Sequence, residues 1–280
     1  MAVKLLIDSS SDIDSAEAKD LGVYMLPIPI TFGEEEYMDG ENISRSEFYD
    51  KLVGCTHLPK TSMVNEFRFN EAFESIVNGG DEVVAIVLSS QLSGTYNAAV
   101  AAAEKYKDKV YVVDSLSATA GIKIMAEYAL TLISQGKSAK EIFDILESKK
   151  SKVQVRAMVD TLKYLKKGGR VSPLLAFAGE LMGIKPMIAV IKGKVEVIGK
   201  VLGAKKAATY INDEIAKVGG IDFDMPFYVL YSGNDQSKID SYISSNTAVL
   251  GASGVRKSCL GATIGTHTGP GVIGIAFFSK

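Results

Sequence analysis

The amino-acid sequence predicts an α/β protein, with an N-terminal α/β/α layer around a largely parallel sheet and a C-terminal α/β domain with a mixed sheet. Short β-branched runs alternate with amphipathic segments in the first half, which is typical of a sheet covered by helices on both faces. The second half adds a hairpin pattern, which indicates antiparallel strands. At 280 residues, 47% of them hydrophobic, the chain is long enough for two domains.

The N-terminal domain is expected to cover residues 1–152. Its strands are predicted at residues 4–7, 23–30, 82–88 and 109–113. Its helices are predicted at residues 14–21, 65–78, 93–106, 117–134 and 138–149. A further helix is predicted after Ser44, because Ser44 and Glu47 form a capping-box pattern ahead of the apolar residues Phe48 and Leu52.

The C-terminal domain is expected to cover residues 153–280. Strands are predicted at residues 154–158 and 227–231 and near Val255 and Val272. Helices are predicted at residues 161–165, 174–182, 205–217 and 238–245. A hairpin is predicted from strands 186–191 and 194–201, because Lys192-Gly193 between them suits a tight turn.

The charge and hydropathy patterns exclude several classes of protein. With 31 basic and 33 acidic residues, and a formal net charge of −2, the chain lacks the positive excess expected of a nucleic-acid-binding protein. No apolar run is long enough to span a bilayer, and the N-terminus lacks a secretory signal pattern. We therefore expect a cytoplasmic protein without stable membrane insertion. Because no heptad pattern is present, we expect a monomer.

Three hydroxyl-rich segments, at residues 8–12, 61–62 and 89–96, are interpreted as strand ends, where open α/β sheets bind ligands. In the third segment, a helix is expected to start near Ser93, so that free backbone N–H groups and hydroxyls favour a carboxylate or a phosphate. The alternative is that Ser93 only caps the helix and that the other hydroxyls satisfy turns.

Two further segments carry candidate functional residues. His267 lies in a glycine-rich segment, residues 265–271, where it could hydrogen-bond an anion or only close a turn. Arg170 follows Gly168-Gly169 in a compact basic turn, which is either a solvated surface or a docking site. His57 is expected in an exposed loop.

The familiar catalytic motifs are missing. The sequence has no phosphate-binding G-x-x-x-x-G-K-[ST] loop, no G-x-G-x-x-G after the first strand, no G-x-S-x-G elbow and no H-E-x-x-H. Cys55 and Cys259 are far apart and are expected as free thiols, so neither a metal site nor a cofactor is predicted. The competing class is an enzyme, either a serine acyl hydrolase using Ser93 and His267 or a small-molecule phosphotransferase.

Seven motifs in order together resemble the DegV family of bacterial fatty-acid-binding proteins, which includes the binding subunits of fatty-acid kinase. The resemblance spans nearly the whole chain. Its motifs are at residues 8–12, 59–62, 92–96, 114–115, 162–172, 184–186 and 267–271.

The resemblance implies a two-domain carrier that is not an enzyme and that holds one long-chain fatty acid in an apolar tunnel between its domains. The ligand-binding residues that it implies are Thr61, Ser62, Ser93, Gly94 and His267. It also implies that a partner fatty-acid kinase phosphorylates the bound carboxylate to an acyl phosphate. Arg170 matches the familial arginine implicated in docking this kinase, and we expect it on a turn too polar to line the tunnel.

Two positions depart from the family pattern. Relatives commonly carry an arginine shortly after the second hairpin strand, where this chain has Leu202. Lys205 or Lys206 would then have to supply positive charge on the docking face. Met63-Val64 stands where relatives often have Gln-Pro, so the local loop conformation could differ.

Overall fold

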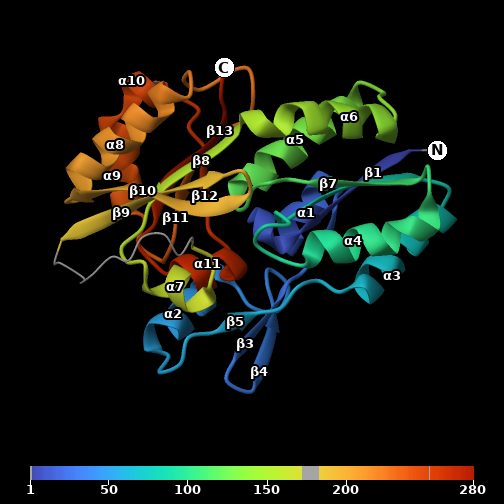
Figure 1. The fold of residues 1–280 in the computed structure, drawn as a ribbon, viewed down its shortest axis with the longest axis horizontal. Coiled ribbons are helices and arrows are strands. Elements are labelled where there is room, and N and C mark those ends of the chain that lie inside the picture. Colours follow the sequence, from blue (N-terminus) through green and yellow to red (C-terminus); the bar gives the residue numbers. More distant parts are fainter. Residues whose placement is uncertain (1, 172–182, 252) are drawn as a thin grey trace.

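The computed structural model describes residues 2–171, 183–251 and 253–280, which form an α/β protein (Figure 1). One of its sheets is parallel throughout, with strand order β2-β1-β6-β7. Its strands are β1 (Val3–Asp8), β2 (Tyr24–Leu26), β6 (Glu82–Val87) and β7 (Val110–Asp114). Figure 1 shows helices on both sides of this sheet, namely α3 (Glu66–Asn78) and α4 (Thr95–Ala103) on one side and α5 (Ala120–Ser134) and α6 (Ala139–Lys149) on the other. The predicted parallel α/β/α layer is therefore confirmed.

A small antiparallel sheet with strand order β4-β3-β5 lies beside this layer. Its strands are β3 (Pro29–Phe32), β4 (Glu35–Met38) and β5 (Lys60–Thr61). The prediction of one continuous strand over residues 23–30 was wrong. Pro27 has no N–H to donate to a ladder, so the chain leaves the parallel sheet after Leu26 and enters the second sheet at Pro29. The sequence analysis missed β4 and β5.

The helix boundaries follow local signals in most places. The capping box at Ser44 and Glu47 is formed and starts α2 (Arg45–Gly54), as predicted. The prediction for residues 117–134 began too early, because Thr119 has a φ of 56°, outside the helical region, so that α5 starts only at Ala120. Helix α1 (Ser15–Leu21) matches its prediction closely.

The C-terminal part forms a six-stranded mixed sheet with strand order β10-β9-β8-β13-β11-β12. Its strands are β8 (Val153–Met158), β9 (Ile184–Ile191), β10 (Lys194–Leu202), β11 (Tyr228–Tyr231), β12 (Lys257–Cys259) and β13 (Ile273–Phe278). The predicted β9–β10 hairpin is confirmed, with an irregularity in register between Val197 and Gly199. The helices of this part include α7 (Lys163–Gly168), α8 (Ala204–Lys217), α9 (Ser237–Ser245), α10 (Thr247–Leu250) and α11 (Ala262–Thr268).

The change from one sheet to the other falls between β7 and β8, which begins at Val153. The domain boundary at residues 152 and 153 stays a prediction, because buried residues of both parts join one hydrophobic cluster. Examples are Ile86 of β6 and Phe278 of β13. The helix predicted at residues 174–182 lies outside the described residues.

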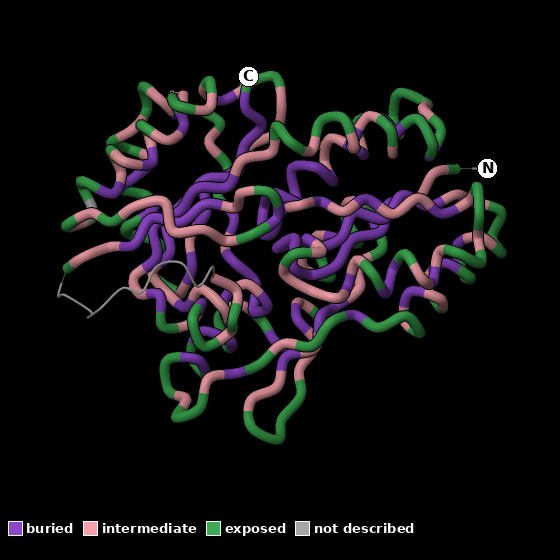
Figure 2. Tube along the Cα trace, viewed as in Figure 1, coloured by how far each residue is buried: buried purple, intermediate pink, exposed green. Residues whose placement is uncertain are grey.

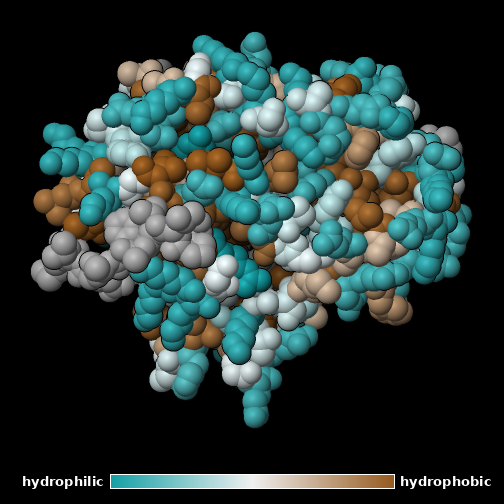
Figure 3. Space-filling view, viewed as in Figure 1, coloured by the Kyte–Doolittle hydropathy of each residue, from teal (hydrophilic) through white to brown (hydrophobic). Residues whose placement is uncertain are grey.

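Burial follows the strands of the two large sheets, which run through the interior in Figure 2. The face seen in Figure 3 is mainly hydrophilic, with apolar side chains between the polar ones. Exposed large apolar side chains include Val53, Phe67 and Leu202. Within the described part of the chain, no helix is both long and apolar enough to cross a bilayer.

Candidate binding site

A cavity of about 310 Å³ lies between the two parts of the chain and is lined mainly by apolar side chains. This volume is at the lower end of the range of about 300–1,000 Å³ that is usual for small-molecule pockets. Strands β8, β9 and β10 contribute part of its wall. The apolar lining residues are Ile28, Met63, Leu88, Leu92, Ala118, Val155, Ala157, Leu165, Ile188, Val190, Val195, Leu230, Leu260, Ile264 and Val272.

All the ligand-binding residues named from the sequence line this cavity: Thr61, Ser62, Ser93, Gly94 and His267. Arg170 lines it too. These residues come from four separate stretches of chain, so only the tertiary fold brings them together.

Thr61 and His267 are directly hydrogen-bonded. The distance between Thr61 Oγ1 and His267 Nε2 is 2.8 Å. If Nε2–H donates to Thr61, the Thr61 hydroxyl proton is free to be donated to an anion in the cavity. His267 Nδ1 is buried without a hydrogen-bond partner. The expectation that residues 265–271 form a turn was wrong for His267, which lies near the end of helix α11.

His267 is neutral near pH 7. Burial, together with the positive charge of Arg170, lowers the pKa of His267 to about 4. A neutral imidazole can donate one hydrogen bond, but it supplies no positive charge to an anion. In this geometry its hydrogen bond with Thr61 fixes where the Thr61 hydroxyl can point.

Helix α7 brings the basic turn against α11. A Cβ atom added at Gly168 would lie only 2.3 Å from His267 Nδ1, so this contact requires glycine. Similarly, a Cβ atom at Gly269 would lie 2.3 Å from the ring of Tyr164 in α7. The glycines of the two motifs thus allow α7 and α11 to approach closely.

Arg170 lies at the cavity wall, and the expectation that it would lie on a turn away from the cavity was wrong. Its Nη1 donates to the Gly168 carbonyl oxygen at 2.6 Å, and its Nε donates to the Leu92 carbonyl oxygen at 3.3 Å. These two bonds tie the guanidinium to the segment that carries Ser93. The polarity of the turn is accommodated because backbone carbonyls accept its hydrogen bonds.

Ser93 and Gly94 lie at the start of α4. The helix begins at Thr95, two residues later than predicted, and its N-cap is Gly94. Ser93 Oγ accepts from Thr95 N at 3.2 Å and is 2.9 Å from Thr95 Oγ1. If Thr95 Oγ1 donates in the second bond, the Ser93 hydroxyl proton also remains available for a ligand.

Met63 lies against Gly94 near the same polar groups. A Cβ atom at Gly94 would lie 2.6 Å from Met63 Sδ. Met63 is 50% exposed and Ser62 is exposed, although both line the cavity. The polar end of the cavity therefore lies close to solvent.

The geometry does not assemble the catalytic pair of a serine hydrolase. His267 Nε2 is engaged by Thr61, whereas the Ser93 hydroxyl is bonded to Thr95. His267 Nδ1 has no acidic partner to orient the ring. Among the described residues, no group of three or more His, Cys, Asp or Glu side chains is placed to hold a metal ion.

The hydroxyl-rich segment at residues 8–12 serves a different purpose from the ligand contact considered for it. It is absent from the cavity lining. The Asp8 carboxylate accepts from the backbone N–H groups of Ser10 and Leu88 at 2.9 and 2.7 Å, which joins β1 to the end of β6. Asp12 holds the N-terminal end of α11.

Sequence reasoning missed other polar residues of the wall, namely Thr119, Thr263 and Thr268. No local pattern distinguishes these threonines from structural ones. It also missed Asp39, a buried carboxylate that contacts α11. Its contact partners are more than 220 residues away in the sequence, so spacing gives no signal for it.

Comparison with known proteins gives a consistent result over the full chain. The DegV family model, described as an uncharacterised protein family, matches residues 2–280. A DegV domain-containing protein of Caldanaerobacter subterraneus is 32% identical over 279 residues, covering 99% of both chains. One from Deinococcus radiodurans is 30% identical over 281 residues, covering 99% of this chain and 98% of the relative.

Solved structures of similar fold include proteins described as binding fatty acids. A DegV family protein from Thermus thermophilus, described by its fatty acid binding, is 29% identical, with a TM-score of 0.88 and full coverage of both chains. DegV from Bacillus subtilis, described as a fatty acid binding protein, is 28% identical, with a TM-score of 0.84 and full coverage of both chains. A stearic acid-binding protein from Eubacterium ventriosum is 25% identical, with a TM-score of 0.86, covering 100% of this chain and 99% of that one.

Proposed function

This chain belongs to the DegV family, and we propose that it binds one long-chain fatty acid in the cavity, with the carboxylate between Thr61 and Ser93. The observation that carries this proposal is a mainly apolar cavity whose wall holds the hydrogen-bonded pair Thr61 and His267 together with Ser93. A ligand that fits such a cavity is a long apolar chain with one anionic group.

The apolar wall accounts for the affinity. Each buried methylene contributes about 0.8 kcal/mol, so a long acyl chain contributes on the order of 10 kcal/mol before the ordering costs are subtracted. Because this contribution is not directional, the shape of the wall would select chain length and unsaturation. Val155, Ile188 and Val195 are among the side chains that set this shape.

The polar groups account for the orientation of the ligand. A carboxylate removed from water needs several donors, and the hydroxyls of Thr61 and Ser93 can both donate to it. The N-terminus of α4 at Gly94 adds backbone N–H groups and a favourable dipole. The Arg170 guanidinium at the wall adds positive charge.

Native mass spectrometry tests the binding proposal. Protein purified without added lipid should carry the additional mass of one long-chain acid. After lipid removal, it should bind a free fatty acid much more tightly than the methyl ester of the same acid, because the ester has no charged oxygen for the donors. Equal binding of acid and ester would contradict the carboxylate site, and binding of neither would contradict the proposal as a whole.

We further propose that the bound carboxylate is presented to a partner fatty-acid kinase, which would convert it to an acyl phosphate. The exposed Ser62 and half-exposed Met63 support this proposal, because they put the polar end of the cavity within reach of a partner. The serine hydrolase alternative is less consistent with the site, because Ser93 lacks a base in hydrogen-bond contact.

The role of Arg170 is tested with a cognate kinase. If Arg170 serves docking, Arg170→Ala should keep its fatty acid and support much slower acyl-phosphate formation, and a higher carrier concentration should partly restore the rate. If Arg170 instead serves the carboxylate, the variant should lose fatty acid, and the kinase rate per loaded molecule should stay normal. The second pattern would contradict the docking role.

A further inference from the structure

We propose that Asp39 is a positioning residue for the fatty-acid headgroup and that it acts by holding helix α11 in place. This inference rests on the proposed function, because it concerns the same carboxylate site. Asp39 follows strand β4 and is itself absent from the cavity wall. Its effect on the ligand is therefore indirect.

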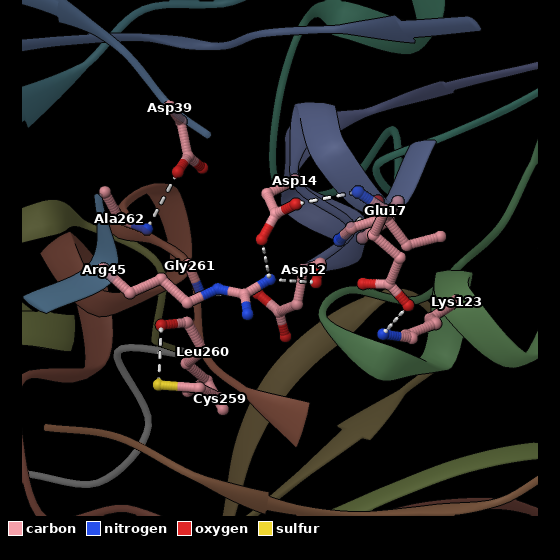
Figure 4. Close-up of polar contacts among 12 residues, drawn as sticks. Asp12, Asp14, Glu17, Asp39, Arg45, Lys123, Cys259, Leu260, Gly261 and Ala262 are labelled. Atoms are coloured by element: carbon pink, nitrogen blue, oxygen red, sulfur yellow. Dashed lines mark hydrogen bonds and ion pairs between the residues drawn. The ribbon is translucent and has the colours of Figure 1, made fainter. Parts of the chain in front are cut away.

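Three backbone N–H groups at the start of α11 donate to carboxylates from the N-terminal part of the chain. Asp39 Oδ1 accepts from Ala262 N at 3.0 Å, and Asp39 Oδ2 accepts from Thr263 N at 2.9 Å. Asp12 Oδ1 accepts from Gly261 N at 2.8 Å. Figure 4 shows the Asp39 carboxylate directed at the Ala262 amide.

Helix α11 depends on such contacts because it has only seven residues. Helices of this length are not stable in isolation. Asp39 binds one end of α11, whereas Thr61 binds His267 near the other end. Four residues, or about 6 Å along the helix axis, separate Thr263 from His267. A displacement of the first turn would therefore move His267 relative to Thr61.

The bidentate contact requires an ionised carboxylate. Both Asp39 oxygens are acceptors, so protonation of either oxygen would set an O–H donor against an N–H donor. The change Asp39→Asn has the same effect, because its amide offers one acceptor and one donor group. This variant thus imitates the protonated residue with nearly the same shape.

Asp39 is 3% exposed and forms no ion pair within the described part of the chain. The titratable groups around it are Asp8 of β1, Asp12, and Tyr49 of α2. Burial raises the pKa values of all three, and the charge of Asp39 raises them further. Burial raises the pKa of Asp39, whereas the bonds from Thr263 and Ala262 act in the opposite direction.

The Arg45 guanidinium is engaged with other acceptors. Arg45 Nη2 donates to the Asp12 carbonyl oxygen at 2.6 Å and pairs with Asp14 at 3.4 Å, as Figure 4 shows. Arg45 thus stabilises the segment around Asp12. The α11 amides of Ala262 and Thr263 donate to Asp39, and the Ser9 side chain also favours its charged form.

The experiment measures fatty-acid dissociation rates from loaded protein between pH 8 and pH 5. Asp39→Asn should accelerate fatty-acid dissociation about three- to tenfold at pH 8. This range is expected when part of the free energy of one charge-assisted hydrogen bond is lost at the headgroup site. The ratio of variant to wild-type rates should fall as the pH is lowered, because burial raises the pKa of Asp39 and the wild-type carboxylate takes up a proton more readily than an exposed one. Titration of the fatty acid itself affects both proteins and cancels in the ratio. A ratio near one at every pH would overturn the proposal.

Asp8→Asn is the matched control. Asp8 is also a fully buried carboxylate with both oxygens bonded to backbone N–H groups, but these groups belong to Ser10 and Leu88 and not to α11. Its rate ratio should be smaller and should not follow the Asp39 profile. Equal profiles for the two variants would indicate a general loss of stability and would overturn a specific role for Asp39.

A double-mutant cycle tests whether Asp39 acts through His267. In a His267→Ala background, Asp39→Asn should change the dissociation rate less than about twofold, because the group that it positions is gone. Persistence of the full effect in this background would overturn the proposed route.

Hydrogen exchange of the ligand-free protein separates this inference from the proposed function. The amides of Ala262 and Thr263 should lose protection in Asp39→Asn, and in the wild-type protein as the pH falls. If these amides respond but no fatty acid binds, the proposed function fails while the hold on α11 stands. If Asp39→Asn does not fold, Asp12→Asn tests the same kind of hold at a single α11 amide, and Gly261 should lose protection in it. Unchanged protection in the folded variant and in the wild type would overturn the inference.

Discussion

Replacing Thr61 with valine tests the headgroup site most directly. Valine keeps the branched shape of threonine and removes the hydroxyl that lies 2.8 Å from His267 Nε2. In our proposal this hydroxyl accepts from His267 and donates to the ligand. The variant therefore removes one donor from a buried carboxylate and leaves the apolar wall almost unchanged.

The magnitude follows from the loss of one hydrogen bond to a charged group. Such a bond contributes about 1.5–3 kcal/mol, so the dissociation constant should rise roughly 10- to 150-fold. Because the acyl chain contributes on the order of 10 kcal/mol, the variant should still bind fatty acid measurably. Burial of the ligand tail is thereby separated from recognition of its carboxylate.

The assay is displacement of a fluorescent fatty acid from folded protein freed of lipid. Thr61→Ser is the control, because it keeps the hydroxyl, and its affinity should stay within about threefold of the wild type. Ser93→Ala should weaken binding within the same range as Thr61→Val. Unchanged affinity in both Thr61→Val and Ser93→Ala would refute the headgroup assignment.

Three other outcomes are expected. Gly168→Ala should weaken fatty-acid binding, because its methyl group would lie 2.3 Å from His267 Nδ1, whereas Gly94→Ala should have less effect, because it meets only the flexible Met63 side chain. The fatty-acid affinities of both variants are compared with that of Gly54→Ala, a control in which the added methyl group meets open space. Equal losses of affinity in Gly168→Ala and Gly94→Ala would contradict this expectation. The free energy of unfolding should fall as the pH drops from about 6.5 to about 4, because the unfolded chain takes up a proton that His267, with its pKa lowered to about 4, does not accept in the folded chain. This change in protonation contributes on the order of 3 kcal/mol to the free energy of unfolding. Urea unfolding at pH 7 and at pH 4.5 should therefore show a weaker pH dependence of stability in His267→Gln than in the wild type. The purified protein should show no turnover of acyl esters or of ATP, and esterase activity that disappears in Ser93→Ala would favour the hydrolase instead.

Many elements could be predicted from the sequence because their signals are local. The strand at β1 and the capping box of α2 depend on residues within a few positions of one another. The β9–β10 hairpin likewise depends on the turn at Lys192-Gly193 and on the apolar runs beside it. Where two signals competed, as at Pro27 within residues 23–30, the missing N–H prevailed over strand propensity.

Helix α11 is an element that local signals did not predict. Its sequence is rich in glycine and threonine, which favour turns over helices. Its first N–H groups donate to Asp39, which lies more than 220 residues earlier in the chain. A cap supplied from another part of the chain leaves no pattern near the helix.

The site divides in the same way between sequence and structure. The seven ordered motifs were enough to identify the family and to name Thr61, Ser93 and His267, because residue types in fixed local spacing are read directly from the chain. Their arrangement was decided only by the tertiary structure, which bonds Thr61 to His267 across 206 residues and places Arg170 at the cavity wall. Strand β5 and helix α7 both pack against α11, and such long-range packing depends on side-chain shape and burial that the order of residues alone does not reveal.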